Sequence, residues 1–171
     1  MENTNFTYRL SRPNEIGTIL NIWETNIRQD YAVTEQTIDD CKKVLTQLFD
    51  SRNECNNFWV SVDNKTMEVI GWQSYFPIFH TPLKKETAVE NSTYILPNYH
   101  KSGVAYHLMK YALSQLPASK VHFVYGFVNK GNNGAIKLVN KIGFREIGII
   151  PAFPSVFPYT QEKILFIYII K

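Results

Sequence analysis

The chain has 171 residues, of which 44% are hydrophobic and 14% aromatic. This length and composition predict a packed globular fold, with a single domain over residues 1–171, and exclude a long disordered tail. Eighteen basic and fifteen acidic residues leave a net charge of +3, and because the charges are dispersed they do not indicate a nucleic-acid partner.

The sequence contains neither an export pattern nor a membrane-spanning pattern. Residues 1–20 hold no basic segment followed by an apolar run, and no stretch of about 18 apolar residues is uninterrupted. We therefore expect a cytoplasmic protein without a membrane partner. Cys41 and Cys55 are expected to be reduced, with a bridge between them as the alternative. The four histidines are scattered, so we expect no metal site.

The N-terminal part begins with one strand pattern and two helix patterns. "FTYRLS" predicts a strand over residues 6–11, and Pro13 is placed to begin a helix that runs to about residue 27. Residues 34–49 predict a second helix capped by Thr34, with "RQDYAV" as a surface loop between the helices. The stripe expected to be buried on this second helix consists of Ile38, Cys41, Val44, Leu45 and Leu48.

The rest of the chain alternates between strand and helix patterns. Two β-rich runs flank the turn "NKTM" and predict a hairpin. Later segments alternate in a way that predicts strands side by side with helices packed over them, in a mixed α/β or α+β sheet of about six or seven strands. The expected strands cover residues 58–63, 68–78, 87–96, 120–128, 144–150 and 162–170, and the later helices cover 102–116 and 132–142.

The start of the helix at 102–116 is a candidate anion site. Ser102 and Gly103 open the helix, and Ala105 follows two positions later. A helix N-terminus has unpaired N–H groups and a partial positive charge, and small residues let an anion approach the backbone. Gly103 and Ala105 therefore suit a phosphate, although small residues at a helix start also have a purely structural explanation.

Three stretches resemble the GNAT acetyltransferase superfamily. Residues 100–105 resemble its acyl-CoA motif, Gln/Arg-x-x-Gly-x-Gly/Ala, with His100 at the first position in place of Gln or Arg. Residues 132–144 resemble its downstream Asn…Gly-Phe block, and residues 87–99 resemble the strand of the phosphinothricin-type N-acetyltransferases. The matching residues are Glu90, Ser92, Tyr94, Pro97, Tyr99, Asn132, Ala135, Leu138, Gly143 and Phe144. The resemblance covers about residues 5–150 and implies a GNAT-like α+β fold, a central mixed and mostly antiparallel sheet flanked by about four helices.

The resemblance implies an N-acetyltransferase that moves an acetyl group from acetyl-CoA to the primary amine of a small molecule, such as an amino acid or an antibiotic-like compound, by direct attack. The backbone of Tyr94, Ile95 and Leu96 would meet the oxyanion and the pantetheine amides, and Asn132 would either contact pantetheine or cap a helix. The residues expected to form the diphosphate cradle are His100, Lys101, Ser102, Gly103, Val104 and Ala105.

Glu90 is the candidate general base, because a carboxylate can assist the deprotonation of an alkylammonium. The alternative is that Glu90 is a solvent-facing strand residue. Ser92 and Tyr94 have the same parity on the strand and should share its face. Val139 stands where many family members have a tyrosine, so another tyrosine or water must protonate the thiolate. The candidates for the acceptor pocket are Tyr31, Trp72, Tyr75, Phe76, Phe79 and Ser92, with core packing as the alternative for Trp72.

Two other functions stay open on the sequence alone. His100 and Val139 also fit a non-catalytic acyl-CoA-binding module. An acyltransferase for protein N-termini or lysines would need an open peptide groove. Residues 151–158 contain three prolines and depart furthest from the family, so the acceptor is not transferred from the resemblance. Analogy with the family adds a homodimer through the apolar final strand.

Overall fold

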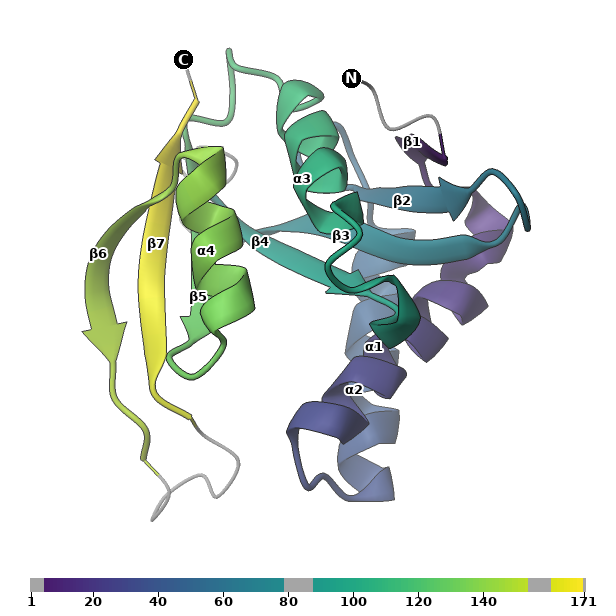
Figure 1. The fold of residues 1–171 in the computed structure, drawn as a ribbon, viewed down its shortest axis with the longest axis horizontal. Helices are drawn as coiled ribbons and strands as arrows, with labels where there is room; N and C mark the ends of the chain where they lie inside the picture. The colour runs from purple at the N-terminus through teal and green to yellow at the C-terminus, as the bar shows by residue number, and fades with distance from the viewer. Residues whose placement is uncertain (1–4, 79–87, 154–160, 171) are drawn as a thin grey trace.

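The computed structural model describes residues 5–78, 88–153 and 161–170. Within these ranges the chain forms one seven-stranded sheet and four α-helices (Figure 1), which confirms the expected α+β fold. The strands are β1 (Phe6–Leu10), β2 (Phe58–Asp63), β3 (Val69–Pro77), β4 (Ala88–Ile95), β5 (Phe123–Asn129), β6 (Arg145–Ile150) and β7 (Lys163–Ile169). The helices are α1 (Ile16–Asp30), α2 (Glu35–Asp50), α3 (Val104–Ser114) and α4 (Asn133–Ile142), and 3-10 turns cover Pro13–Glu15 and Pro97–Tyr99.

The strand order is β1-β2-β3-β4-β5-β7-β6, and every neighbouring pair is antiparallel except β4–β5. The parallel ladder between β4 and β5 runs only as far as Asn91 opposite Gly126. Beyond this pair the two strands diverge, as Figure 1 shows. The C-terminal strands do not follow chain order, because β7 lies between β5 and β6.

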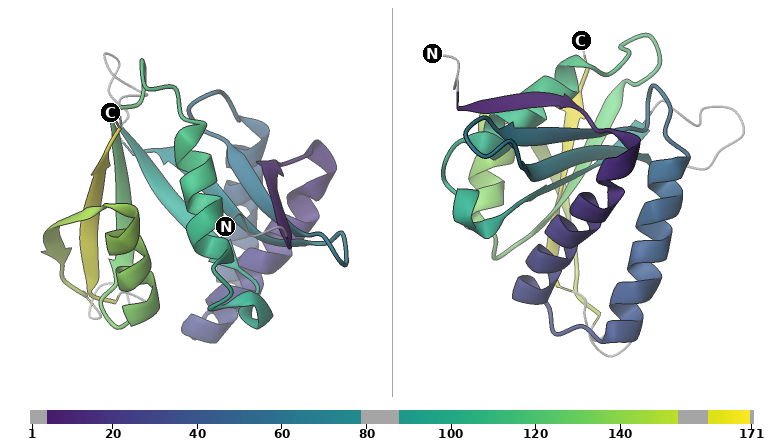
Figure 2. Two further views of the ribbon diagram at one scale, coloured as in Figure 1. Left: turned by 45° about the horizontal axis from the view of Figure 1, so that its top comes forward. Right: turned by 90° about the vertical axis from the view of Figure 1, so that its right-hand side faces the viewer.

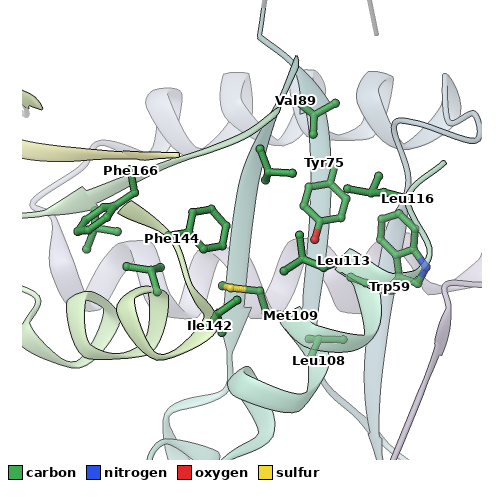
Figure 3. Close-up of a cluster of buried hydrophobic side chains, with 14 of the residues drawn as sticks. Trp59, Tyr75, Val89, Leu108, Met109, Leu113, Leu116, Ile142, Phe144 and Phe166 are labelled. Carbon is green, nitrogen blue, oxygen red and sulfur yellow. The ribbon is translucent and has the colours of Figure 1, made fainter. Parts of the chain in front are cut away.

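The helices cover the two faces of the sheet unequally. α1 packs on one face, against β3 and β4, and α2 packs against α1, while α3 crosses the other face (Figure 2). On the α3 side a large core joins α3 to α4 and the C-terminal strands, and Figure 3 shows Met109 and Leu113 between the aromatic residues of the two parts. On the α1 side a smaller core surrounds Trp72. β4 is therefore packed on both faces, which fixes the direction of each of its side chains.

The two N-terminal helices differ from the expectation in detail. The Thr34 hydroxyl accepts a hydrogen bond from the N–H of Thr37 at 3.2 Å, which confirms the predicted cap. α1 continues to Asp30, so the first half of the expected loop is helical. α2 buries Ile38, Leu45 and Phe49, whereas Cys41 and Val44 are exposed. α2 rests mainly on α1, so a narrower stripe than expected is covered.

Two further findings concern the expectations about membranes and thiols. None of the helices in the described ranges is both long and apolar enough to cross a membrane. Cys41 and Cys55 are not joined by a disulfide, in agreement with the expected reduced thiols.

Candidate active site

A cleft of about 950 Å³ opens where β4 and β5 separate. Its walls come from the end of α1, residues Glu90 to Ile95 of β4, the beginning of α3, the end of β5, the beginning of α4 and the first residue of β7. Segments far apart in the chain therefore meet around one cavity; Gln161, for example, lies close to Asp30, 131 residues earlier. Glu90, Gly103 and Asn132 all line it, so the three stretches singled out in the sequence converge on one site.

The turn before α3 exposes backbone N–H groups toward this cleft. Lys101 and Gly103 both have positive φ, 64° and 86°, and this left-handed backbone turns successive peptide units toward one side. The Ser102 hydroxyl donates to the Tyr99 carbonyl at 2.6 Å and faces the N–H of Val104 at 3.4 Å. The N–H groups without an acceptor among the described residues are those of Lys101, Gly103, Ala105 and Tyr106. Unpaired N–H groups at a helix N-terminus form an anion site.

His100 lines the cleft, but its ring is used to hold the end of β4. Its Nε2 lies 3.0 Å from the carbonyl oxygen of Ile95, and because a carbonyl only accepts, Nε2 carries the proton. The side-chain amide of Asn26 donates to the same oxygen at 3.1 Å. The His100 ring therefore links the end of β4 to the turn before α3.

The backbone groups of β4 that face the cleft are not all those expected from the sequence. The N–H of Leu96 donates to Ile70 of β3 at 2.8 Å, and the carbonyl of Ala88 accepts from Ile78. Since backbone direction alternates along a strand, the even-numbered residues of β4 bond to β3 and the odd-numbered ones face β5. The backbone groups of Thr93 and Ile95 therefore face the opening. The backbone of Tyr94 and Leu96 was expected to contact the cofactor, but in this register their backbone groups face β3. Leu96 also does not line the cleft.

Glu90, Ser92 and Tyr94 project from the α1 face of β4 and line the cleft, as their shared parity predicted. Glu90 is partly buried, and burial raises the pKa of its carboxyl, while the positive charge of Lys163 opposes part of that rise. Burial also raises the pKa of Tyr94 to about 12, so this phenol stays protonated near pH 7. Among these three residues of β4, Glu90 is thus the one suited to accept a proton.

The mouth of the cleft on the α1 side is bridged by side chains. The side-chain amide of Asn129 donates to the Tyr31 hydroxyl at 2.7 Å, and Gln161 donates to the Asp30 carbonyl at 3.4 Å. Tyr31 was expected at the acceptor pocket, and it lines the cleft. Asn129, Gln161 and Lys163 were missed, because the sequence carried no signal for which end of a late strand meets α1.

Three aromatic residues of β3 that were expected in the acceptor pocket lie outside the cleft. Trp72 is 1% exposed, and its ring N–H donates to the Ile19 carbonyl at 2.9 Å. Tyr75 lies on the opposite face, in the α3 core shown in Figure 3. Phe76 packs edge to face against Phe58, with their ring centroids 5.5 Å apart. Core packing accounts for these rings, and Phe79 lies outside the described residues.

Asn132 and Val139 link α4 to the cleft. The Asn132 side-chain oxygen accepts from the N–H of Ala135 at 2.9 Å, so the helix-cap alternative is confirmed, and Asn132 lines the cleft as well. Val139 is 3% exposed and belongs to the α3 core. In the described part of the chain, no group of three or more His, Cys, Asp or Glu residues is placed to hold a metal ion.

Comparison with known proteins connects this arrangement to one family. Residues 18–144 match the family described as Acetyltransferase (GNAT). The chain is 26% identical over 145 residues to the protein named "Putative phosphinothricin acetyltransferase YwnH" of Bacillus subtilis, covering 85% of this chain and 87% of that one.

Two solved structures share the fold. A crystal structure described as a "putative phosphinothricin N-acetyltransferase" superposes with a TM-score of 0.79 at 21% identity, over 97% of this chain and 99% of the other. The structure described as "yncA, a putative acetyltransferase from Salmonella typhimurium with its cofactor Acetyl-CoA" has a TM-score of 0.75 at 17% identity, over 98% of this chain and 95% of the other.

Proposed function

Because the chain belongs to the GNAT acetyltransferase family, we propose that it transfers the acetyl group of acetyl-CoA to the primary amine of a small molecule. The observation that carries the proposal is the continuity of the cleft. One cavity joins the unpaired backbone N–H groups at the start of α3 to the partly buried carboxyl group of Glu90. A cofactor anchored at the first place and an amine held at the second would meet along β4.

The turn before α3 fits a diphosphate on local grounds. A Cβ added to Gly103 would meet only the His107 ring, at 3.9 Å, so packing does not require a glycine here. A glycine is favoured here by the φ of 86° and by the close approach of a ligand to the backbone. We assign the diphosphate to the N–H groups of Lys101, Gly103, Ala105 and Tyr106, with the Lys101 ammonium as an added positive charge. When bound, acetyl-CoA supplies an activated acyl carbon and a thiol leaving group.

Residues on the α1 face of β4 would prepare the amine. An alkylammonium is almost entirely protonated near pH 7, so it must lose a proton before it can attack. We assign the removal of that proton to Glu90, directly or through one water molecule. The raised pKa of Glu90 lies closer to neutral pH than the pKa of an exposed carboxyl group. Ser92 and Tyr94 line the same wall and would orient the amine. Val139 has no proton to donate, so we assign protonation of the thiolate to solvent.

A small acceptor is favoured by the bridged mouth. The Asn129–Tyr31 and Gln161–Asp30 hydrogen bonds join residues at the end of α1 to the end of β5 and to the segment before β7, and all four residues line the cleft. An extended peptide that entered across these hydrogen bonds would have to break both, whereas an amino acid or another small amine would need less room. Lys163 adds a positive charge to the same wall and would favour an acceptor with a negative group, such as a carboxylate.

The test is a thiol-release assay with acetyl-CoA and a panel of amines. The panel should contain amino acids, aminoglycoside-like amines, polyamines and peptides with free N-termini or lysines. We expect release of CoA with at least one small amine and none with peptides. Binding of CoA without release for any amine would support a non-catalytic module instead, and preference for a peptide would support a protein acetyltransferase.

A further inference from the structure

A polar cluster lies on the face of β3 and β4 that α3 covers. It consists of Gln73, Asn91 and Thr93, which we call the Gln73 cluster. Gln73 is fully buried, and its side-chain amide nitrogen donates to the Ser74 carbonyl at 3.0 Å and to Asn91 Oδ1 at 2.5 Å. The Thr93 hydroxyl donates to Gln73 Oε1. Polar side chains in an apolar core are unfavourable unless they are hydrogen-bonded, so this cluster calls for a reason beyond packing.

The hydrogen bonds fix which way the Asn91 amide points. The Ser74 carbonyl can only accept, so the atom of Gln73 that faces it is the nitrogen Nε2. The atom of Asn91 that faces the same nitrogen must then be the oxygen Oδ1. Nδ2 of Asn91 is consequently directed away from Gln73. Asn91 lines the cleft, and no described residue accepts a hydrogen bond from its Nδ2.

Asn91 stands at the closed end of the cleft. It is the last residue of β4 that pairs with β5, opposite Gly126, which places no side chain there. The turn that we assign to the diphosphate begins beyond Ile95, four residues further along. At about 3.3 Å per residue this is ~13 Å of strand. A ligand anchored at that turn and running along β4 would therefore have its acyl end at Asn91.

We propose that Nδ2 of Asn91 donates a hydrogen bond to the acyl oxygen of the bound thioester, and that Gln73 is the positioning residue that holds Asn91 for this purpose. The inference rests on the proposed function. Glu90 and Asn91 are neighbours on one strand, so they face opposite sides of the sheet. The amine reaches the acyl carbon from the Glu90 side.

This placement favours the transition state over the ground state. When a nucleophile adds to one face of a carbonyl, the oxygen moves toward the opposite face and gains negative charge. Here the opposite face is that of Asn91, so the hydrogen bond becomes stronger as the charge develops. Donors placed where charge develops are a main source of enzymatic rate acceleration.

The variant that separates this role from a structural one is Asn91→Asp. Aspartate has the same shape and keeps an oxygen for the Gln73 Nε2–H group, but it replaces the donor toward the cleft by an acceptor. We expect kcat to fall by on the order of 10²–10³-fold, with little change in KM for acetyl-CoA. Asn21→Asp, an exposed position on α1, is the matched control and should keep the wild-type kcat. A kcat for Asn91→Asp close to that of the control would overturn the inference.

A second measurement does not depend on turnover. Acetonyl-CoA keeps the carbonyl group but has a methylene between it and the sulfur, so it cannot transfer acetyl. A hydrogen bond lowers the carbonyl stretching frequency, which infrared difference spectroscopy of the ¹³C-labelled ligand detects. We expect a lower frequency in the wild type than in Asn91→Ala, and equal frequencies would overturn the inference.

The positioning role of Gln73 is tested by a double-mutant cycle. Gln73→Met removes the amide that holds Asn91 while keeping a similar side-chain length. We expect it to lose part of the frequency shift and part of kcat, and the double variant with Asn91→Ala should lose no more than Asn91→Ala alone. Additive losses would mean that Gln73 acts independently of Asn91 and would overturn its assignment.

The outcomes separate this inference from the proposed function. If calorimetry shows that the wild type binds neither CoA nor acetonyl-CoA, the proposed function fails and the inference fails with it. If the wild type transfers acetyl groups but the Asn91 variants match it in kcat and in carbonyl frequency, only the inference fails. If the frequency shift depends on Asn91 but no amine is acetylated, the hydrogen bond stands and acetyl transfer does not.

Discussion

The two ends of the cleft are built in different ways. The end before α3 is one continuous turn that offers backbone N–H groups, and only Gly103 and Lys101 in it have positive φ. The end near Glu90 is assembled from side chains of α1, β4, β5 and β7. A backbone site tolerates many side chains and fails when its conformation or access is lost. A side-chain site depends on each group, so changes there should alter turnover and pH dependence more than cofactor affinity.

The largest expected effect is at the backbone end. Gly103→Glu places a side chain and a negative charge where the diphosphate is expected, in a conformation that L-residues rarely adopt. We expect CoA binding to become undetectable in a calorimetric titration. Gly17→Glu is the matched control, because no atom lies within 4 Å of a Cβ built there, and it should bind CoA as the wild type does. Unchanged affinity in Gly103→Glu would refute the assignment of this turn.

At the side-chain end, Glu90→Gln should lower kcat/KM for the amine by about 10²–10⁴-fold, the range for loss of a general base. Affinity for CoA should be nearly unchanged, in contrast to Gly103→Glu. The wild-type rate should fall as the pH drops through the pKa of Glu90, which burial places above its usual value of 4.5. Equal pH–rate profiles for the wild type and the variant would remove Glu90 from the mechanism.

Glu90→Gln should also raise the free energy of unfolding at pH 7, which further distinguishes the side-chain end of the cleft from the backbone end. A carboxyl with a raised pKa binds more protons in the folded state than in the unfolded one, so the free energy of unfolding falls as the pH rises from 4.5 through the folded-state pKa. Above that pKa the loss is complete. Glu90→Gln should therefore have a higher Tm than the wild type at pH 7, and the difference should shrink below about pH 4.5. A lower Tm at pH 7 would contradict the assigned burial cost.

The smallest expected effect comes from Lys163, whose positive charge lowers the pKa of Glu90. Lys163→Met removes that charge, so the pKa of Glu90 should rise further. The acidic limb of the pH–rate profile should then move to higher pH, by less than the change caused by loss of Glu90 itself. Lys43→Met, on the exposed side of α2, is the charge-matched control. An acidic limb at the same pH in both variants would place Lys163 too far from Glu90 to matter.

The part of the site that is formed by consecutive residues could be predicted from the sequence, whereas the part assembled from separate elements could not. The turn at 100–105 is a local feature, since six consecutive residues and the helix that follows determine it, and the sequence located it. The shared face of Glu90, Ser92 and Tyr94 followed from strand parity alone. Asn129 and Lys163 could not be found in this way, because Asn129 reaches Tyr31 through the placement of β5 beside β4, and Lys163 joins the cleft through the placement of β7 beside β5.

The errors on β3 have an equally physical cause. Trp72 and Tyr75 differ in parity, so they project from opposite faces of one strand and cannot line one pocket. A face of the sheet can hold a pocket only where other elements leave that face uncovered. The face at Trp72 is covered, because Ile19 and Tyr94 contact the Trp72 ring. The directions of the β4 amides depend on its register with β3, which no local pattern encodes.

The early parting of β4 and β5 also bears on how the molecule deforms. Their ladder is shorter than any other between neighbouring strands of the described sheet. A twist about this seam changes the width of the cavity while leaving the longer ladders on either side intact. The tether between Tyr31 and Asn129 spans the gap and opposes that twist. Loss of this phenol–amide contact should therefore leave the width of the cavity less constrained.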